Sequence, residues 1–516
     1  MTIYHSPFAA IDLPPVSITD YVIPALRARA DLPVLIDGPT GRALTGAMLL
    51  DLIRRLAGGL TARNLGPGHV VAIMAPNIPE YAAVFHGVAY AGGTITTINP
   101  AYTADEVRFQ LLDARAEILI TIPAFEGTAK AASVGTGVTE VFVLGDAAGD
   151  SRFEDLLGAP QLAQTPVDLH RHTVVLPYSS GTTGLPKGVM LSHANLVANV
   201  AQLKAVFPID PGEVSIAVLP FFHIYGMNAI MNPFLVQQAV QITLPRFDLE
   251  LFLRLIQTHK VAKVFVVPPV VLALAKHPLI DSFDLSTLRA VFSGAAPLGA
   301  ELSNACAARL NCEVIQGYGM TELSPVSHAT QVGHNLPGSS GRALPLTRCR
   351  IIDTETGLDV AAGDVGELWI SGPQVMQGYL NNPAATAATL DADGWLRTGD
   401  IARIDADGFM FIVDRLKELI KYKGFQVPPA ELEALLQTHP AVADVAVVGA
   451  ADAEAGEIPV AFVVTKPGAA QDGDDVRAFV AGHVASYKQI RQVRFVDAIP
   501  KSASGKILRR MLKAQL

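Results

Sequence analysis

The chain has 516 residues, 50 % of them hydrophobic, and 39 basic residues stand against 48 acidic ones for a formal net charge of -9. This length allows two to four domains and a large buried core, and the mild, evenly spread negative charge excludes an extended nucleic-acid-binding surface. The three cysteines, Cys306, Cys312 and Cys349, have no CxxC spacing, which argues against a disulfide framework or zinc site and favours a cytoplasmic protein.

The start of the chain predicts alternating strands and helices. MTIYHSPFAAIDLPP has neither a basic start nor a long apolar run, so we expect no secretory signal. Runs rich in β-branched residues, 69–77 and 94–100, are followed by helical patterns over 79–92 and 103–115. This alternation predicts an α/β fold with mostly buried parallel strands.

The stretch YSSGTTGLPKGVMLSH (178–193) lies between a predicted strand, 174–178, and a predicted helix from Ala194 onwards. Its serine, threonine and glycine residues are typical of loops whose backbone N–H groups wrap phosphate oxygens, although a short loop of this kind is often only a turn. It is not a Walker P-loop, because Pro186 and Gly188 stand where that motif needs glycine and serine or threonine.

Residues 214–245 contain no Asp, Glu, Lys or Arg, and by length alone they could span a bilayer. Prolines, a glycine and several amide side chains interrupt the run, and a lipid-facing helix would have to satisfy all of them internally. We therefore predict a buried strand, loop and helix of a large core, with attachment to one membrane face as the alternative.

The pattern changes near Asp414, in a charged segment between two apolar strands. The remaining residues, about a hundred, predict a small separate α+β domain, which divides the chain into domains 1–414 and 415–516. Its predicted elements are a helix at 430–440, strands at 442–450 and 458–465, a helix at 474–485 and a strand at 493–500.

Seven further motifs follow the Ser/Thr/Gly stretch in order. They are LPFFHIYGM (219–227), SGAAPLG (293–299), QGYGMTELSP (316–325), GELWISGPQVMQGYL (366–380), WLRTGD (395–400), VDRLKELIKYKGFQVPPAELE (413–433) and PKSASGKILRR (500–510). Together they resemble the signatures of the adenylate-forming superfamily of acyl-CoA synthetases, luciferases and nonribosomal adenylation domains. HIYGM and KELIKYKGFQV most resemble 4-coumarate:CoA ligases and their bacterial relatives. The resemblance implies a large domain with a β-barrel-like subdomain and a small mobile C-terminal domain.

The resemblance also implies a two-step reaction. A carboxylic acid first reacts with ATP to give an acyl-AMP and pyrophosphate, and the thiol of coenzyme A then takes the acyl group. Both steps move negative charge, which preorganised donors, lysines and Mg²⁺ would stabilise. The expected cofactors and co-substrates are therefore ATP, Mg²⁺ and coenzyme A, beside a small carboxylic acid, with no nucleic acid and no integral membrane segment.

By the same resemblance, Tyr318 would stack on adenine, Asp400 and Arg415 would hold the ribose, and Lys187 would neutralise phosphate. Glu322 would be the Mg²⁺ carboxylate, and a single carboxylate is enough for an ion that keeps several waters. The whole expected nucleotide set is Ser179, Ser180, Gly181, Thr182, Thr183, Lys187, Gln316, Gly317, Tyr318, Gly319, Thr321, Asp400 and Arg415.

The expected catalytic residues belong to both domains. Lys506 would reach the carboxylate and the α-phosphate in the first step, and His223 would orient the acid. The hinge over Asp414–Lys417, with Lys417 as its centre, would then withdraw Lys506 and present another face for thioester formation. That face carries Lys421, Lys423, Gly424 and Gln426, with Arg246 as a contact to coenzyme A phosphate.

The expected acid pocket is apolar with one phenol: Ile224, Tyr225, Ala229, Phe292, Ala295, Gly317, Pro325 and Val326. Apolar residues at Phe292 and Ala229 weaken the case for a free ring hydroxyl, which would lose hydrogen bonds to water there. Hydroxycinnamate, cinnamate, benzoate-like or medium-chain aliphatic acids all stay open, whereas Tyr225 and Phe292 should exclude very long chains.

Two other function classes compete with an acid:CoA ligase. One is an acyl-AMP ligase that loads a carrier protein or acts like a luciferase, and the other is a non-catalytic nucleotide-binding homologue. Arg246 and KYKGFQ favour coenzyme A as acceptor, and the retention of Lys187, Glu322 and Lys506 favours catalysis. The sequence leaves the oligomeric state open, with a homodimer as one alternative, and leaves acetylation of Lys506 as a regulatory hypothesis.

Overall fold

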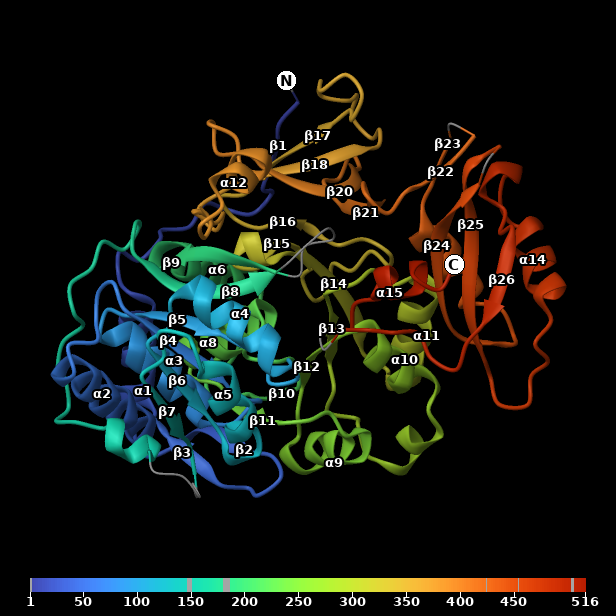
Figure 1. Cartoon of the computed structure of the whole chain (residues 1–516). Helices are drawn as coiled ribbons and strands as arrows, with labels where there is room; N and C mark the ends of the chain where they lie inside the picture. Colours follow the sequence, from blue (N-terminus) through green and yellow to red (C-terminus); the bar gives the residue numbers. More distant parts are fainter. Residues whose placement is uncertain (1, 146–150, 180–185, 424, 453, 503–504) are drawn as a thin grey trace.

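The computed structural model describes residues 2–145, 151–179, 186–423, 425–452, 454–502 and 505–516. The predicted α/β alternation is confirmed by a seven-stranded sheet in the first part of the chain (Figure 1). Neighbouring strands β8, β5, β4, β6 and β7 run parallel, and β9 and β19 extend one edge in antiparallel pairing. Its strands in spatial order are β19 (Gly378–Tyr379), β9 (Lys187–Ser192), β8 (Thr173–Ser179), β5 (Thr94–Thr97), β4 (Val70–Met74), β6 (Ile118–Thr121) and β7 (Glu140–Val143).

Two further sheets complete the main body and share its apolar core. The first combines three parallel strands with two antiparallel ones: β12 (Lys263–Val266), β13 (Ala290–Ser293), β14 (Glu313–Gly319), β15 (Val326–Ala329) and β16 (Arg342–Ala343). The second has the order β10 (Val214–Ala217), β11 (Val240–Thr243), β2 (Pro33–Asp37) and β3 (Ala43–Thr45).

The barrel-like part of the expectation corresponds to an entirely antiparallel sheet above the main body (Figure 1). Its pairing is open, since the strand order ends at β1 on one side and β21 on the other. The strands are β1 (Tyr4–His5), β17 (Arg348–Ile352), β18 (Gly366–Ser371), β20 (Leu396–Ile404) and β21 (Met410–Arg415).

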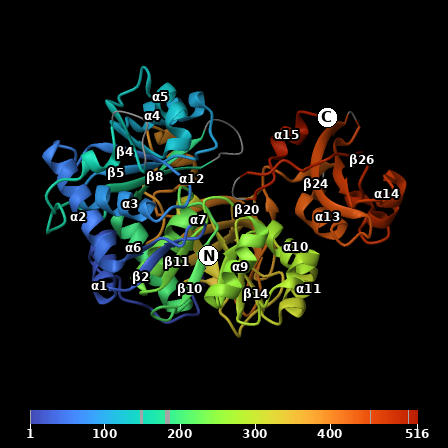
Figure 2. The same cartoon turned by 90° about the horizontal axis from the view of Figure 1, so that it is seen from below.

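The residues from Ile420 to the end, called the C-terminal unit below, build a sheet of their own (Figures 1 and 2). Two apolar clusters belong to this unit alone, one on each face of the β24–β25 pair. Its strands are β22 (Ile420–Tyr422), β23 (Phe425–Val427), β24 (Val442–Asp452), β25 (Gly456–Thr465) and β26 (Gln492–Phe495).

Helices cover the sheets, as Figures 1 and 2 show from two sides. Serine, threonine, aspartate or asparagine caps the start of seven of the described helices of at least seven residues, as in Thr103 before α4, where it forms a capping box with Glu106. The helices are α1 (Ile18–Ala28), α2 (Gly46–Ala62), α3 (Glu80–Tyr90), α4 (Ala104–Ala114), α5 (Glu126–Ser133), α6 (His193–Val206), α7 (Ile224–Gly226), α8 (Asn232–Val236), α9 (Leu249–His259), α10 (Pro268–Lys276), α11 (Ala300–Leu310), α12 (Pro383–Thr389), α13 (Pro429–Leu436), α14 (Gly473–Ala481) and α15 (Arg509–Lys513). Short 3-10 turns are η1 (Pro123–Phe125), η2 (Phe153–Leu156), η4 (Pro278–Ser282), η5 (Thr321–Leu323) and η6 (Ser486–Lys488), and η3 (Met227–Met231) is a π-turn.

The uncharged stretch 214–245 is buried in the main core, as predicted. It forms β10, then α7, η3 and α8, then β11, and the amide side chain of Asn228 donates to Ser324 O at 2.6 Å. Across the described ranges, no helix combines the length and apolar character needed to cross a membrane.

One strand lies where the sequence suggested only a connection. Residues Lys187–Ser192 form β9 between β8 and α6, because Val189 and Leu191 alternate into the core and are fully buried. The stem of the predicted phosphate loop is therefore a β8–β9 pair.

Candidate active site

The predicted ribose residues meet where β14, β20 and β21 come together. The Tyr318 hydroxyl donates to Asp400 Oδ2 at 2.6 Å, and Arg415 Nε lies 3.3 Å from Asp400 Oδ1. Asp400 and Arg415 are directly opposed in the antiparallel ladder, which fixes this pairing. Burial and the Asp400 charge raise the pKa of Tyr318, so its hydroxyl stays a donor. The result is a buried carboxylate held by a phenol and a guanidinium.

A second cluster surrounds the predicted metal carboxylate Glu322, in η5. Its Oε1 accepts from the Tyr379 hydroxyl at 2.7 Å and from Ser179 Oγ at 3.3 Å. The Lys187 ammonium lies over the Tyr379 ring, 4.6 Å from its centre. Tyr379 lies within the GELWISGPQVMQGYL motif, but a single tyrosine has no distinctive sequence signal that would identify it as a site residue.

Glu322 suits a divalent cation. Both hydrogen bonds that the described residues donate to its carboxylate go to Oε1, and Oε2 receives none from them. A hard oxygen donor beside the stem of the predicted phosphate loop is the chemistry that Mg²⁺ prefers.

Lys506 reaches these two clusters from the C-terminal unit. Its side chain is partly buried, and this desolvation with the nearby Arg415 charge lowers its pKa to about 8, while Asp400, Glu322 and Glu418 act in the opposite direction. The adjacent Gly505 has φ +77°, and a Cβ there would lie 3.2 Å from Val267 Cγ2. The segment carrying Lys506 is thus packed directly on the β12–α10 connection of the main body.

His223 stands at the start of α7, and its Nδ1 accepts from Tyr225 N at 3.2 Å. Burial, helped by the Lys506 charge, lowers its pKa to about 4, so the ring is neutral near pH 7. The preceding loop is held by Asn77, whose amide donates to Ala217 O and Leu219 O at 2.8 Å each.

The predicted acid-pocket residues gather beside this histidine. Tyr225, Ala229 and Val326 belong to one apolar cluster with Phe207, and the Phe207 ring meets the Phe292 ring edge-on at 4.7 Å. Phe292 also stacks on a further ring, Phe265, at 4.5 Å.

The other predicted pocket residues flank this cluster. Ile224 is the first residue of α7. Ala295 has φ +71° and follows Gly294, where a Cβ would lie 2.8 Å from the Tyr225 ring. Gly317 and Pro325 lie in and beside the β14–β15 pair.

The side chain of Gln316 makes backbone contacts that the sequence did not predict. Its amide donates to Leu298 O and accepts from Leu298 N, both at 3.1 Å. The side chain therefore fixes the loop before α11. Thr321 is buried in η5, and Gly319 leaves no room for a side chain, because a Cβ would lie 2.2 Å from Pro325 O.

The residues predicted for thioester formation lie apart from the Lys506 cluster. Lys421 and Gln426 face each other across the β22–β23 hairpin, and both are exposed, as are Lys417 and Lys423. Arg246 is exposed after β11 in the main body. The predicted residues Ser180, Gly181, Thr182, Thr183 and Gly424 lie outside the described residues.

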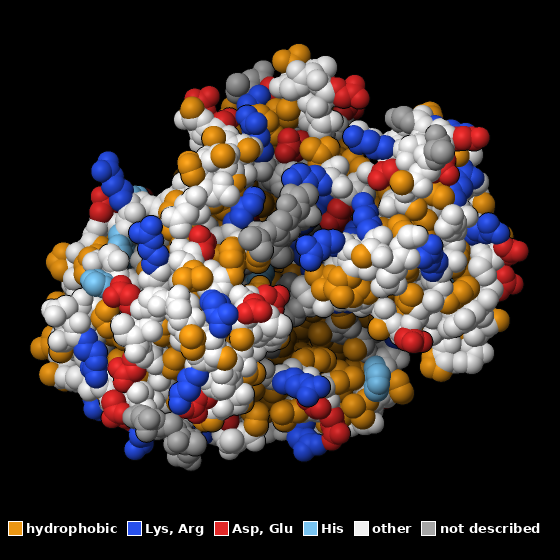
Figure 3. Space-filling model, viewed as in Figure 1, with side chains coloured by type: hydrophobic (Ala, Val, Ile, Leu, Met, Phe, Trp, Pro, Cys, Tyr) orange, Lys and Arg blue, Asp and Glu red, His pale blue; other side chains and the backbone are white. Residues whose placement is uncertain are grey.

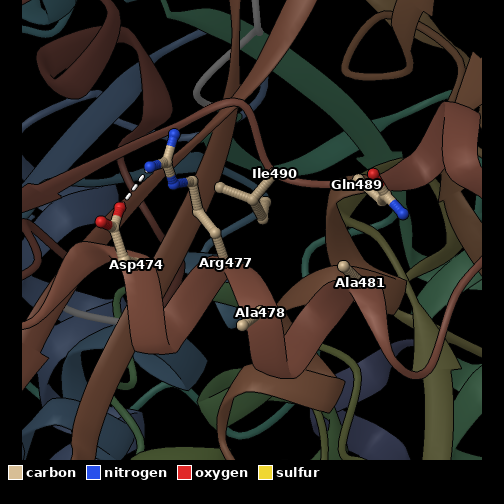
Figure 4. A pocket seen from close by; sticks show the side chains of 6 residues that line it. All are labelled: Asp474, Arg477, Ala478, Ala481, Gln489 and Ile490. Atoms are coloured by element: carbon tan, nitrogen blue, oxygen red, sulfur yellow. Dashed lines mark hydrogen bonds and ion pairs between the residues drawn. The ribbon is translucent and has the colours of Figure 1, made fainter.

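One surface hollow lies near the junction of the C-terminal unit with the main body, and another lies on the C-terminal unit alone (Figures 3 and 4). Figure 3 shows Lys and Arg side chains gathered where the C-terminal unit meets the main body, above a hollow with hydrophobic walls. A separate shallow hollow on α14 has Asp474 and Arg477, which pair with each other, beside Gln489 and Ile490 (Figure 4). That hollow has no free catalytic group and belongs to the C-terminal unit alone.

Known proteins match over nearly the whole chain. The family described as AMP-binding enzyme matches residues 24–380, and AMP-binding enzyme C-terminal domain matches 431–506. A 4-coumarate--CoA ligase 5 of Oryza sativa subsp. japonica is 44 % identical over 509 residues, covering 96 % of this chain and 94 % of the relative.

Solved structures agree. ATP-bound MatB from Rhodopseudomonas palustris has a TM-score of 0.89 at 30 % identity, covering 97 % and 99 % of the two chains, whereas apo MatB has 0.78. The anthranilate CoA ligase AuaEII with anthranoyl-AMP has 0.90 at 26 % identity, covering 98 % and 99 %. With its signature residues gathered around Asp400, Glu322 and Lys506, the chain belongs to the AMP-binding, adenylate-forming enzyme family.

Proposed function

We propose that this protein is an ATP-dependent acid:CoA ligase that forms an acyl-AMP, releases pyrophosphate and passes the acyl group to coenzyme A. The observation that carries the proposal is the position of Lys506, a lysine of the C-terminal unit whose charge interacts with Asp400 and Glu322 of the main body. The 44 % identical rice relative is a CoA ligase by name, which supports coenzyme A as acceptor over a carrier protein.

In the first step, Lys506 lowers the repulsion between the acid's carboxylate and the ATP phosphates. A unit charge at about 4 Å contributes about 4 kcal/mol at the effective dielectric of a partly buried site. Asp400 and Arg415 hold the ribose, Tyr318 carries the adenine, and Lys187 balances the departing pyrophosphate. Glu322 would hold Mg²⁺, which would supply further stabilisation of phosphate charge.

The second step needs different surroundings for the acyl phosphate, and a single rigid site cannot offer both. We therefore infer two domains, 1–414 and 415–516, that rotate about Asp414–Lys417. The two self-contained apolar clusters of the C-terminal unit support independent movement. Rotation would bring Lys421, Lys423 and Gln426 to the site and coenzyme A phosphate towards Arg246.

The acid is an aryl acid of hydroxycinnamate, cinnamate or benzoate type. The stacked rings of Phe292 and Phe265 support a flat apolar partner, and burial keeps Tyr225 a neutral phenol by raising its pKa. A medium-chain aliphatic acid is the second candidate, because Ala229, Val326 and the ring of Tyr225 belong to one apolar cluster. A cytoplasmic location and a homodimer complete the proposal.

The two half-reactions test the proposal. In Lys506→Ala, acid-dependent exchange of pyrophosphate into ATP should vanish, while thioester formation from supplied acyl-AMP is largely kept. Lys513→Ala, at an exposed lysine of α15, is the matched control and should retain both. Equal loss of both half-reactions in the Lys506 variant would reject the assigned roles. AMP release with coenzyme A over a panel of aryl and six- to twelve-carbon acids then identifies the substrate class.

A further inference from the structure

Tyr379 lies where the parts of the triphosphate half of the site meet. It belongs to β19, which pairs with β9, the strand that begins with Lys187. Its hydroxyl donates to Glu322 Oε1 at 2.7 Å, and the face of its ring lies under the Lys187 ammonium, 4.6 Å away. One buried side chain therefore contacts both the metal carboxylate and the phosphate lysine through two different chemical groups.

The backbone holds Tyr379 in a single place. Its N–H donates to Thr386 Oγ1 at 2.9 Å, and Leu380 N donates to Gly188 O at 2.8 Å. The preceding Gly378 has φ +147°, and a Cβ there would lie 2.8 Å from Thr386 Cγ2, so no other residue fits at that position. The backbone of Tyr379 is thus held between α12 and the edge of the seven-stranded sheet.

The hydroxyl and the ring do separate work. The hydroxyl is the donor in its bond to Glu322, because the carboxylate offers only acceptor oxygens. A hydrogen bond to a charged acceptor is strong and directional, so it fixes the carboxylate rotation and leaves Oε2 for a cation. The ring face attracts the Lys187 ammonium through its quadrupole and restricts where that flexible side chain points.

We infer that Tyr379 is a positioning residue that aligns Glu322 for a divalent cation through its hydroxyl and Lys187 for phosphate through its ring. The inference rests on the proposed function, because it takes Glu322 and Lys187 as the groups that meet metal and phosphate. It assigns the two contributions to separable parts of one side chain, so two substitutions distinguish them.

Tyr379→Phe removes only the hydroxyl, and Tyr379→Leu removes hydroxyl and ring. Tyr90→Phe is the matched control, since the buried Tyr90 hydroxyl donates to Leu162 O at 3.0 Å away from the site. Two equilibria are measured without the acid, so that no reaction occurs: Mn²⁺ binding to the enzyme–ATP complex by electron paramagnetic resonance, and ATP binding without divalent metal by calorimetry. Circular dichroism checks that each variant is folded.

In Tyr379→Phe, we expect the dissociation constant for Mn²⁺ to rise roughly tenfold, from the loss of a charge-assisted hydrogen bond, with metal-free ATP binding unchanged. In Tyr379→Leu, metal-free ATP binding should also weaken, by about two- to fivefold, from the loss of the cation–π contact. The control should match the wild type in both equilibria.

Wild-type Mn²⁺ affinity in folded Tyr379→Phe would overturn the role of the hydroxyl. Wild-type metal-free ATP affinity in folded Tyr379→Leu would overturn the role of the ring. If Tyr379→Leu does not fold, Lys187→Met takes its place, because the ring acts on ATP only through Lys187. Metal-free ATP binding that is as strong in Lys187→Met as in Tyr379→Phe would then overturn the role of the ring. A wild-type enzyme that binds ATP but forms no acyl-AMP from any acid would refute the proposed function, an outcome independent of these comparisons.

Discussion

The charge of Lys506 should oppose its own docking when no nucleotide is present. Burial and Arg415 lower its pKa to about 8 from the ordinary 10.5. A lowered lysine pKa means that the docked form binds the proton more weakly than the undocked form. At about 1.36 kcal/mol per pKa unit, docking the charged lysine costs about 3 kcal/mol. This cost is complete below pH 8 and disappears as the pH rises towards 10.5, where the lysine is neutral in both forms.

Lys506→Met removes the charge and nearly keeps the length of the side chain. Without ATP at pH 7, we expect the variant to favour the docked form over the undocked by about a hundredfold more than the wild type does. The assay is hydrogen exchange of the peptide over β12 and α10, because Gly505 packs on Val267 there. Raising the pH from 7 to 9 should protect this peptide further in the wild type, after correction for intrinsic exchange, and leave the variant unchanged.

With ATP bound, the wild type should protect the β12–α10 peptide more than Lys506→Met does. The phosphates of ATP are anionic, so they stabilise the docked charged lysine and should protect the peptide in the wild type but not in Lys506→Met. Lys513→Met, at an exposed lysine, controls for the loss of a charge in general. Identical protection in wild type and Lys506→Met without ATP at pH 7 would refute the reasoning, as would a wild type that does not respond to pH.

Three further substitutions test the fold and the nucleotide site. Burial lowers the pKa of His328 to about 3, so this group should lower the free energy of unfolding by about 2 kcal/mol between pH 6.5 and 5. Urea titrations should show that His328→Gln loses this part of the pH dependence. A variant with the pH dependence of the wild type would contradict the prediction. A Cβ in Gly226→Ala would lie 2.2 Å from Pro220 O, so calorimetry should show a melting temperature lower by several degrees or more; a wild-type melting temperature would refute the clash. Tyr318→Phe loses the 2.6 Å bond to Asp400, so the KM for ATP should rise about tenfold with little change in kcat, whereas an unchanged KM would exclude a role for this bond.

Local sequence patterns determined the elements and their type. The periodicity of 79–92 and 103–115 predicted α3 and α4 closely, and the change of pattern near Asp414 predicted a separate C-terminal sheet. Such features depend on neighbours in the chain, which alternate or recur with the period of a strand or helix. Polar interruptions likewise predicted that the uncharged run 214–245 is buried rather than membrane-spanning.

The candidate site was predictable only as far as its residues lie in distinctive motifs. Asp400, Glu322 and Lys506 were found in this way, although no pattern in the chain says that they meet. Tyr379 was missed, since a lone tyrosine next to a glycine has many roles. Gln316 was assigned to the nucleotide, whereas its amide bonds to the backbone of Leu298, a partner distant enough in sequence that no local rule connects them.

The sequence by itself therefore determined the type of most elements and which motif residues are candidates for the chemistry, because both depend on residue type and short-range spacing. Only the tertiary structure decided that Lys506 docks on the β12–α10 connection, that Tyr379 joins Glu322 to Lys187, and that the hairpin with Lys421 faces outwards. The first two contacts join segments that are far apart in the sequence, and their geometry follows from how the sheets pack on one another rather than from any local preference.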